Sequence, residues 1–363
     1  MRALLCTRLD GPEHLEIVEI PDPVPGPGQA LVRIRLAALN FFDTLIVAGR
    51  YQVKPPLPFS PGGEGIGVVE ALGEGASGVV VGDRVIVHAG HGCCAELIAI
   101  DAAKLTAVPE AVPDAQAAGL TITYGTSLHA LANRARIQPG EWLAVLGASG
   151  GVGLAAVELG RLMGARVIAC ASSEEKLAVA RAHGAEATLV YDPATLKDEL
   201  RRTSGGGVDV VYDAVGGDYA EPALRALAWR GRYLVIGFAA GGIPRLPLNL
   251  MLLKELDVQG VHWGAFLERE PEAHRADQRR LLAWVAEGKR VYTDTSWAIG
   301  FAPRWFAAEI ERHGIGHDRV LFASDQPWGD FEGEHARLAA ATGDGELADL
   351  VFRGNFEQLH RLF

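Results

Sequence analysis

The stretch LGASGGVGLAA, residues 146–156, constrains the fold of this chain more than any other. An apolar run, WLAVL, precedes it, and a helical pattern of small residues follows it. Such a strand, glycine turn and helix start gather free backbone N–H groups at the positive end of a helix dipole, where they bind phosphate. The sequence therefore predicts a phosphate-binding loop at Ser149, Gly150, Gly151 and Val152, the alternative being a tight strand-to-helix turn without a ligand.

The pattern of apolar residues changes along the chain. Short apolar or alternating runs, separated by turns rich in Pro and Gly, fill residues 1–122, which predicts a β domain. Residues 123–289 alternate apolar runs with helical patterns, which is typical of a βαβ series with a parallel sheet. The fold class predicted from these patterns is α/β.

The end of the next apolar run, RVIAC, indicates which dinucleotide the loop binds. NAD-preferring sites place a carboxylate roughly 20 residues after the loop, where it accepts a hydrogen bond from the ribose 2′-OH. Here Ser172 and Ser173 occupy that place, and Lys176 follows within one turn. Two hydroxyls and an ammonium suit a 2′-phosphate, which favours NADPH. The alternative is that Ser172 or Ser173 only caps the following helix.

Composition limits the other partners. The chain has 34 basic and 45 acidic residues and a net charge of −11, which disfavours nucleic acid and anionic membrane surfaces. No apolar run reaches the ~18 residues of a membrane span, and the first 20 residues lack the apolar centre of a signal peptide. The four cysteines show no disulfide spacing. We therefore expect a cytoplasmic protein that acts on a small molecule.

Six motifs in order carry a resemblance to a known family: ALNFFDTLIVAGRY, PFSPGGEGIGVVEALG, GDRVIV, AAGLTITYGTSLHAL, PGEWLAVLGASGGVG and VDVVYDAVGG. Residues 1–289 resemble the zinc-independent quinone oxidoreductase branch of the medium-chain dehydrogenase/reductase superfamily. The resemblance implies a GroES-like β domain over residues 1–122 and a Rossmann domain, a doubly wound parallel sheet, over residues 123–289. It also implies NADPH-dependent reduction of a quinone or another activated conjugated acceptor, such as an enone or an enoyl thioester.

The resemblance further assigns individual residues. Asn40, Tyr51 and Thr126 match residues near the nicotinamide and the substrate, and their amide and hydroxyl groups are the predicted donors to an oxygen that becomes negative. The predicted cofactor-binding residues are Ser149, Gly150, Gly151, Val152, Ser172, Ser173, Lys176, Tyr191, Phe238 and Gly264. A homodimer, formed by sheet edges near the run LDVQGV, is also implied.

Residue types at the zinc positions of related dehydrogenases argue against a metal. A catalytic zinc site needs three protein ligands and an open position. Asn40 and Phe41 stand where zinc-dependent relatives place a Cys ligand, and Gly63 stands where they place a His. The run HAGHGCC, residues 88–94, has ligand chemistry, but adjacent cysteines seldom bind one ion without strain. We therefore expect no metal.

Residues 290–363 do not continue the family pattern. Within them VLFASDQPW resembles the last strand of a metal-dependent amidohydrolase barrel, with Asp325 as its metal-site aspartate, and VFRGNFEQL resembles its closing helix. A complete barrel needs roughly 250 residues, and none of the 11 histidines forms the His-x-His pair of such sites. We expect an atypical αβ tail fused near residues 289–291.

Two alternatives to the reductase stay open at this point. The fused tail could leave a protein that binds NADPH with impaired turnover. An amidohydrolase-type metal hydrolase fragment is the weaker alternative, because the histidine ligands are missing.

Overall fold

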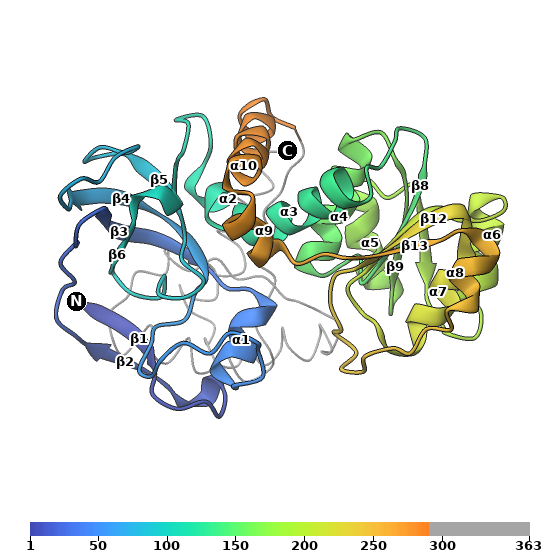
Figure 1. Ribbon diagram of the computed structural model, residues 1–363, viewed down its shortest axis with the longest axis horizontal. Helices are drawn as coiled ribbons and strands as arrows, with labels where there is room; N and C mark the ends of the chain where they lie inside the picture. Colours follow the sequence, from blue (N-terminus) through green and yellow to red (C-terminus); the bar gives the residue numbers. More distant parts are fainter. Residues whose placement is uncertain (290–363) are drawn as a thin grey trace, which may run out of the picture. The chain divides into compact units, whose positions relative to one another are not determined.

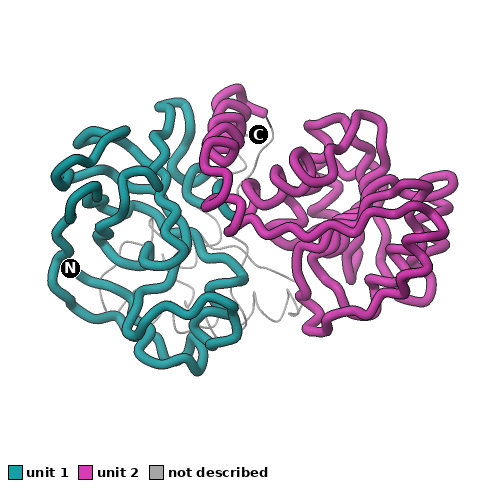
Figure 2. Tube along the Cα trace, in the orientation of Figure 1, with its two compact units in different colours: residues 1–122, 293–363 teal, residues 123–292 magenta. Residues whose placement is uncertain are grey.

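The computed structural model describes residues 1–289, and these form two compact units. The first unit contains residues 1–122, and the second begins at Thr123 (Figure 2). The predicted αβ tail, with Asp325, lies outside the described residues. Each unit has a sheet and an apolar core of its own.

Antiparallel strands build the first unit (Figure 1). Five strands form one sheet in the order β6-β3-β4-β5-β7, and β1 pairs with β2 in a separate ribbon. The strands are β1 (Arg2–Cys6), β2 (Leu15–Glu19), β3 (Gln29–Ala38), β4 (Glu64–Leu72), β5 (Arg84–His88), β6 (Leu97–Asp101) and β7 (Leu105–Ala107). Val32, Val69, Val85 and Val87 come from three neighbouring strands and are buried together in its core. This confirms the predicted β domain.

Helices in this unit are short and follow strand ends. Single turns of 3-10 helix lie at Pro12–His14 and Ala102–Lys104. The α-helices are α1 (Phe41–Val47) and α2 (Asp114–Ala118), and α3 (Leu120–Leu128) begins at the end of the unit and continues into the next. Because α1 starts three residues after β3 ends, Asn40 in the connection is fixed by both elements.

The second unit is a six-stranded parallel sheet in the order β10-β9-β8-β11-β12-β13. Its strands are β8 (Trp142–Leu146), β9 (Arg166–Ala171), β10 (Ala187–Val190), β11 (Val208–Asp213), β12 (Leu227–Val235) and β13 (Asp257–Gly260). The chain winds outward from β8 in one direction through β9 and β10, and then in the other direction from β11. This order is that of a doubly wound Rossmann sheet and confirms the predicted fold class.

The helices of the second unit connect or follow these strands (Figure 1). They are α4 (Gly151–Leu162), α5 (Glu174–Ala182), α6 (Leu196–Ser204), α7 (Ala220–Ala226), α8 (Asn249–Lys254), α9 (Trp263–Arg269) and α10 (Pro271–Ala286), with a π-helix at His129–Arg134 and a 3-10 turn at Gly217–Tyr219.

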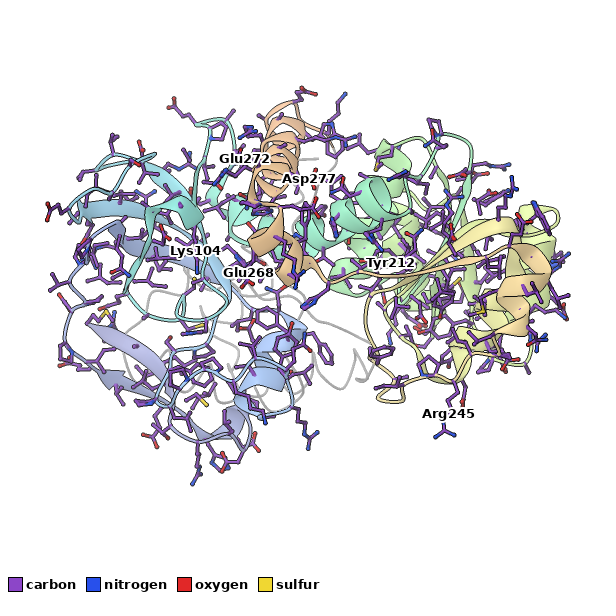
Figure 3. All side chains as sticks on the ribbon, in the orientation of Figure 1. Lys104, Tyr212, Arg245, Glu268, Glu272 and Asp277 are labelled. Atoms are coloured by element: carbon purple, nitrogen blue, oxygen red, sulfur yellow. The ribbon has the colours of Figure 1, made fainter. Side chains whose placement is uncertain are left out.

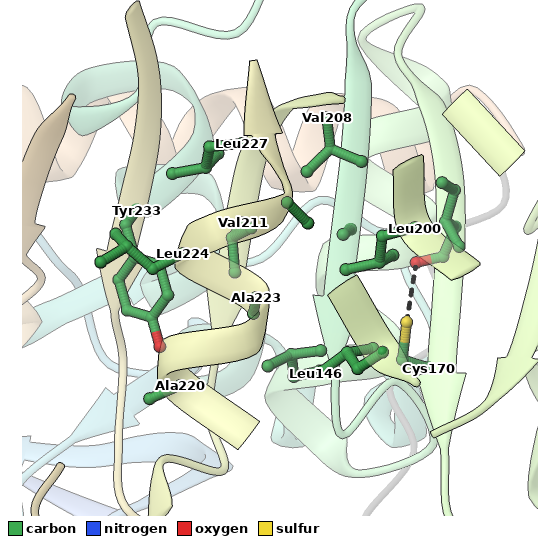
Figure 4. Close-up of a cluster of buried hydrophobic side chains, with 14 of the residues drawn as sticks. Leu146, Cys170, Leu200, Val208, Val211, Ala220, Ala223, Leu224, Leu227 and Tyr233 are labelled. Carbon is green, nitrogen blue, oxygen red and sulfur yellow. Dashed lines mark hydrogen bonds between the residues drawn. The ribbon is translucent and has the colours of Figure 1, made fainter. Parts of the chain in front are cut away.

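Apolar side chains from strands and helices fill the core of this unit (Figure 4). Leu146, Cys170 and Val211 come from three adjacent strands, and Leu200 and Leu224 come from helices α6 and α7. All five side chains are fully buried. A parallel sheet covered by helices explains why these strands are almost continuously apolar in the sequence.

Candidate functional site

The glycine loop connects β8 to α4 at the point where the winding of the sheet reverses. In parallel α/β sheets, ligands bind at this switch point beyond the carboxyl ends of the strands. Gly147 has a φ of 74°, in the left-handed region, and a Cβ on Gly153 would lie 2.0 Å from the Gly147 carbonyl oxygen. Gly150 is the N-cap residue and Gly151 the first residue of α4. The loop therefore folds back on the helix start because Gly147 and Gly153 lack side chains.

Helix α3 is tied to the same loop. The Ser127 hydroxyl donates to the Val152 carbonyl oxygen at 2.8 Å and lies 2.9 Å from the Tyr212 hydroxyl of β11. Thr126 precedes Ser127 on α3 and is half-buried. The second unit thus holds Thr126 one residue away from a side chain that contacts the predicted pyrophosphate loop.

The end of β9 places a lysine against two serines. The Lys176 ammonium donates to the Ser172 hydroxyl at 2.9 Å, whereas the Ser173 hydroxyl accepts from the Lys176 backbone N–H and caps α5. Lys176 is only 8% exposed, while Ser172 is exposed. Ser173 is therefore the helix cap that the alternative hypothesis describes, and Ser172 with Lys176 forms a separate polar pair.

Tyr191 lies next to this pair. Its backbone N–H donates to the Ala171 carbonyl oxygen at the end of β9, at 3.1 Å. Its ring centroid is 4.5 Å from that of Tyr219, and burial raises the pKa of the Tyr191 hydroxyl. The structure thus brings Tyr191 to the strand end that carries Ser172.

Phe238 and Gly264 lie on other elements than Ser172, Lys176 and Tyr191. Phe238 follows β12 and is 40% exposed. Its Cδ1 lies 2.9 Å from the place where a Cβ on Gly216 would be, so the ring packs on the turn after β11. Gly264 lies on α9, where the nearest atom to an added Cβ belongs to His262, at 3.8 Å. Gly264 is therefore positioned by a helix and not by the end of a parallel strand.

A surface depression of about 500 Å³ lies on the second unit, beyond β11 and β12. Its lining comes from Gly217, Asp218, Glu221, Pro222, Arg225, Gly242, Ile243, Pro244 and Arg245. Arg245 extends away from the sheet (Figure 3). None of the predicted cofactor residues belongs to this lining, so the depression marks a different surface from the glycine loop.

The predicted residues of the first unit lie at and after the start of α1. Asn40 is the N-cap residue of this helix, and its side-chain amide Nδ2 donates to Glu64 Oε1 at 2.9 Å. The ring centroid of Tyr51 lies 5.6 Å from that of Phe42, on the same helix. Burial and the neighbouring Asp43 raise the pKa of the Tyr51 hydroxyl, which keeps it a neutral donor.

Two buried carboxyl groups beside Asn40 were missed by the sequence analysis as site residues. Asp43, 5% exposed, accepts from the Asn40 N–H at 2.7 Å and the Gly62 N–H at 3.1 Å, and burial raises its pKa to about 7. Glu64 is fully buried, and burial raises its pKa to about 8. For Glu64, the available signal was an acidic residue among glycines at the start of an apolar strand that is buried in the fold.

From these two carboxyl groups we predict that the free energy of unfolding falls as the pH rises. The ordinary pKa values, which apply to the unfolded chain, are 3.8 for Asp43 and 4.5 for Glu64, against about 7 and about 8 in the fold. Between these limits the folded state holds more protons, so the free energy of unfolding decreases with pH.

Asp43→Asn removes one of the two titrations. In urea denaturation we expect the wild-type free energy of unfolding to fall relative to that of Asp43→Asn between about pH 4 and pH 7, the range between the unfolded and folded pKa values of Asp43. Curves that stay parallel over this range would show that Asp43 titrates normally.

The part of the chain that the structure describes has no cluster of metal-binding side chains. Within residues 1–289 no three His, Cys, Asp or Glu side chains gather in a way that could hold an ion. In the HAGHGCC run, burial raises the pKa of the Cys93 and Cys94 thiols, which disfavours the thiolate form that binds metals. No helix among these residues is long and apolar enough to cross a membrane.

Three protein families match the chain. The alcohol dehydrogenase GroES-like domain matches residues 26–114, and the zinc-binding dehydrogenase family matches residues 151–284. The amidohydrolase family matches residues 250–362 and overlaps the end of the second match. The last match confirms the resemblance that the sequence analysis found for the tail.

Individual relatives match about four fifths of the chain. The chain is 42% identical over 289 residues to quinone oxidoreductase-like protein 2 of Rattus norvegicus, covering 79% of this chain and 82% of the relative. The quinone oxidoreductase of Pseudomonas syringae pv. tomato is 31% identical with a TM-score of 0.73, covering 79% of this chain and 89% of that chain. The quinone oxidoreductase of Thermus thermophilus, also solved with NADPH, is 32% identical with a TM-score of 0.66, covering 80% and 88%.

Proposed function

The chain belongs to the quinone oxidoreductase branch of the medium-chain dehydrogenase/reductase superfamily, a group of NAD(P)-dependent oxidoreductases, and we propose that it reduces quinones or other activated conjugated acceptors with NADPH and without zinc. The glycine loop at the switch point of the parallel sheet is the observation that carries this proposal. Relatives whose names include quinone oxidoreductase support the acceptor class.

The residues present fit a dinucleotide. The first turn of α4 offers backbone N–H groups next to a turn that a Cβ at Gly153 would fill, so a pyrophosphate can approach the backbone closely. The Lys176 ammonium and the Ser172 hydroxyl stand at the end of β9, where an NAD site has a carboxylate. A cation and a donor hydroxyl at this place favour NADPH over NADH.

Bound NADPH would supply hydride to the acceptor. The protein's part is to bind the acceptor and to stabilise the negative charge that develops on its oxygen. Asn40 offers a side-chain amide that Glu64 already holds by one N–H, and Tyr51 offers a hydroxyl that stays protonated at neutral pH. We assign donation to that oxygen to these two groups and to the Thr126 hydroxyl.

Zinc does not fit the donor set of the first unit. Asn40 and Gly63 stand at positions where zinc-dependent relatives carry ligands, and neither provides a ligand of the usual kind. Glu64 uses Oε1 for Asn40 and Oε2 for two backbone N–H groups. The proposed reaction therefore has no metal-dependent step.

The deciding experiment is turnover by the full chain. We expect NADPH oxidation, followed by its absorbance, with 1,4-benzoquinone and short enones, and a lower kcat/KM with NADH. Absence of turnover with every acceptor, while NADPH still raises the melting temperature, would favour the alternative of a binding protein impaired by its fused tail. Activity that required added metal would overturn the zinc-independent proposal.

We further propose that the chain forms a homodimer through the β13 edge of the parallel sheet. Within the described residues, β13 pairs only with β12, which leaves its other edge open. Leu252 and Leu253 on the neighbouring helix α8 are 80% and 66% exposed, and Val258 on β13 is 41% exposed. Exposed aliphatic groups beside an open edge favour association. Light scattering should give the mass of two chains, and Leu252→Lys with Leu253→Lys should reduce it to one.

A further inference from the structure

Glu64 connects two parts of the first unit through its two carboxyl oxygens. Oε1 accepts from the Asn40 side-chain amide at 2.9 Å. Oε2 accepts from the backbone N–H groups of Thr121 and Ile122, both at 2.9 Å. Thr121 and Ile122 lie in the first turn of α3, whose N–H groups have no partner within the helix. One buried side chain therefore caps a helix and holds an amide that we place in the substrate site.

Helix capping alone does not explain a glutamate at this position. A Ser, Thr or Asp immediately before α3 would satisfy the same N–H groups without burying a carboxyl group from another strand. Glu64 is fully buried, and burial disfavours its charged form, as the raised pKa shows. The contact that a local cap could not make is the one to Asn40, 24 residues away in the sequence.

The orientation of the Asn40 amide follows from this contact. A carboxyl oxygen that accepts a hydrogen bond must face the NH₂ end of the amide rather than its carbonyl end. The amide nitrogen carries two hydrogens, and Glu64 uses one of them. The direction of the other hydrogen is then fixed by the plane of the amide.

We propose that Glu64 is a positioning residue, which orients the Asn40 amide so that its second N–H is held ready to donate to the acceptor oxygen. This inference rests on the proposed reductase function. Glu64 itself does not touch the substrate. Its contribution to the rate is therefore expected to vanish when Asn40 is removed.

A double-mutant cycle tests this dependence. At pH 9, above the pKa of about 8, Glu64 accepts hydrogen bonds with both oxygens, whereas in Glu64→Gln the new NH₂ group must face either Asn40 or the two backbone N–H groups, so one set of hydrogen bonds is lost. We expect kcat to fall roughly 10-fold, a part of the ~100-fold loss typical when an oxyanion donor is removed. The KM for NADPH should stay unchanged. In an Asn40→Ala background, Glu64→Gln should change kcat by less than about twofold, whereas equal losses in both backgrounds would overturn the proposal.

A second variant covers the case in which Glu64→Gln folds poorly. In Glu64→Gln with Asn40→Asp, the glutamine oxygen can accept from Thr121 and Ile122 while its NH₂ group donates to the new aspartate. We expect a melting temperature close to that of wild type but a low kcat, because aspartate has no N–H to donate. A wild-type kcat in this folded variant would show that the Asn40 amide is not the donor.

Side-chain amide NMR separates failure of this inference from failure of the proposed function. The Asn40 NH₂ signals, identified by their loss in Asn40→Ala, should be well separated in wild type and should converge in Glu64→Gln. Unchanged signals would overturn the orienting role even in an active enzyme. Converging signals in a protein without turnover would support the orientation of Asn40 and overturn the reductase function instead.

Discussion

Replacing Gly153 with valine is expected to lower kcat/KM for NADPH by roughly 100-fold or more. A Cβ at this position would lie 2.0 Å from the Gly147 carbonyl oxygen and 3.0 Å from the Ala148 Cα. Both are backbone atoms of the same loop, so they cannot move away without opening the turn. Loss of two charge-assisted hydrogen bonds to the pyrophosphate, at about 1.5–3 kcal/mol each, accounts for a change of this size. Steady-state kinetics with varied NADPH measures it.

Gly205→Asn is the control for this change. Gly205 ends α6 in the left-handed region, which asparagine tolerates, and no atom lies within 4 Å of the place where its Cβ would be. We expect wild-type kinetics and a normal melting temperature for this control. If Gly153→Val bound NADPH as tightly as Gly205→Asn does, the glycine loop would not be the pyrophosphate site.

The turn at the glycine loop and the alternation of parallel strands with helices were predictable because their signals are local. A turn with a φ of 74° at Gly147, followed by a helix start at Gly151, is specified by neighbouring residues. The α/β class follows from the alternation of apolar runs with helical patterns, since the central runs become the buried strands β8, β9 and β11. The predicted fold class was therefore confirmed because it depends on patterns among neighbouring residues.

Contacts between distant residues could not be predicted in the same way. Glu64 meets Thr121 and Ile122 across 57 and 58 residues of sequence, and no periodicity links these positions. The sequence showed only that Ser172, Ser173 and Lys176 are close together, whereas the fold shows that Ser173 caps α5 and that Lys176 is buried against Ser172. Which polar groups share a site depends on tertiary packing, and a single sequence does not encode that packing as a pattern.

We propose that the Lys176 ammonium decides the choice between NADPH and NADH. It is only 8% exposed and is fixed by the Ser172 hydroxyl at 2.9 Å, so little side-chain freedom is lost when it binds an anion. Lysine at such a site acts as a point charge toward phosphate. NADH has a hydroxyl in place of the 2′-phosphate of NADPH, so its affinity should depend little on this charge.

Lys176→Met is expected to raise the KM for NADPH by about 10-fold to 100-fold and to leave the KM for NADH nearly unchanged. One charge-assisted hydrogen bond to a phosphate contributes about 1.5–3 kcal/mol, which corresponds to that range. Methionine keeps most of the buried aliphatic stem, so the packing of α5 should survive. Lys197→Met on α6 is the control, because its ammonium is exposed and pairs with Asp198. An equal rise of the KM for both cofactors in Lys176→Met would mean that Lys176 supports the fold of the pocket rather than recognises the 2′-phosphate.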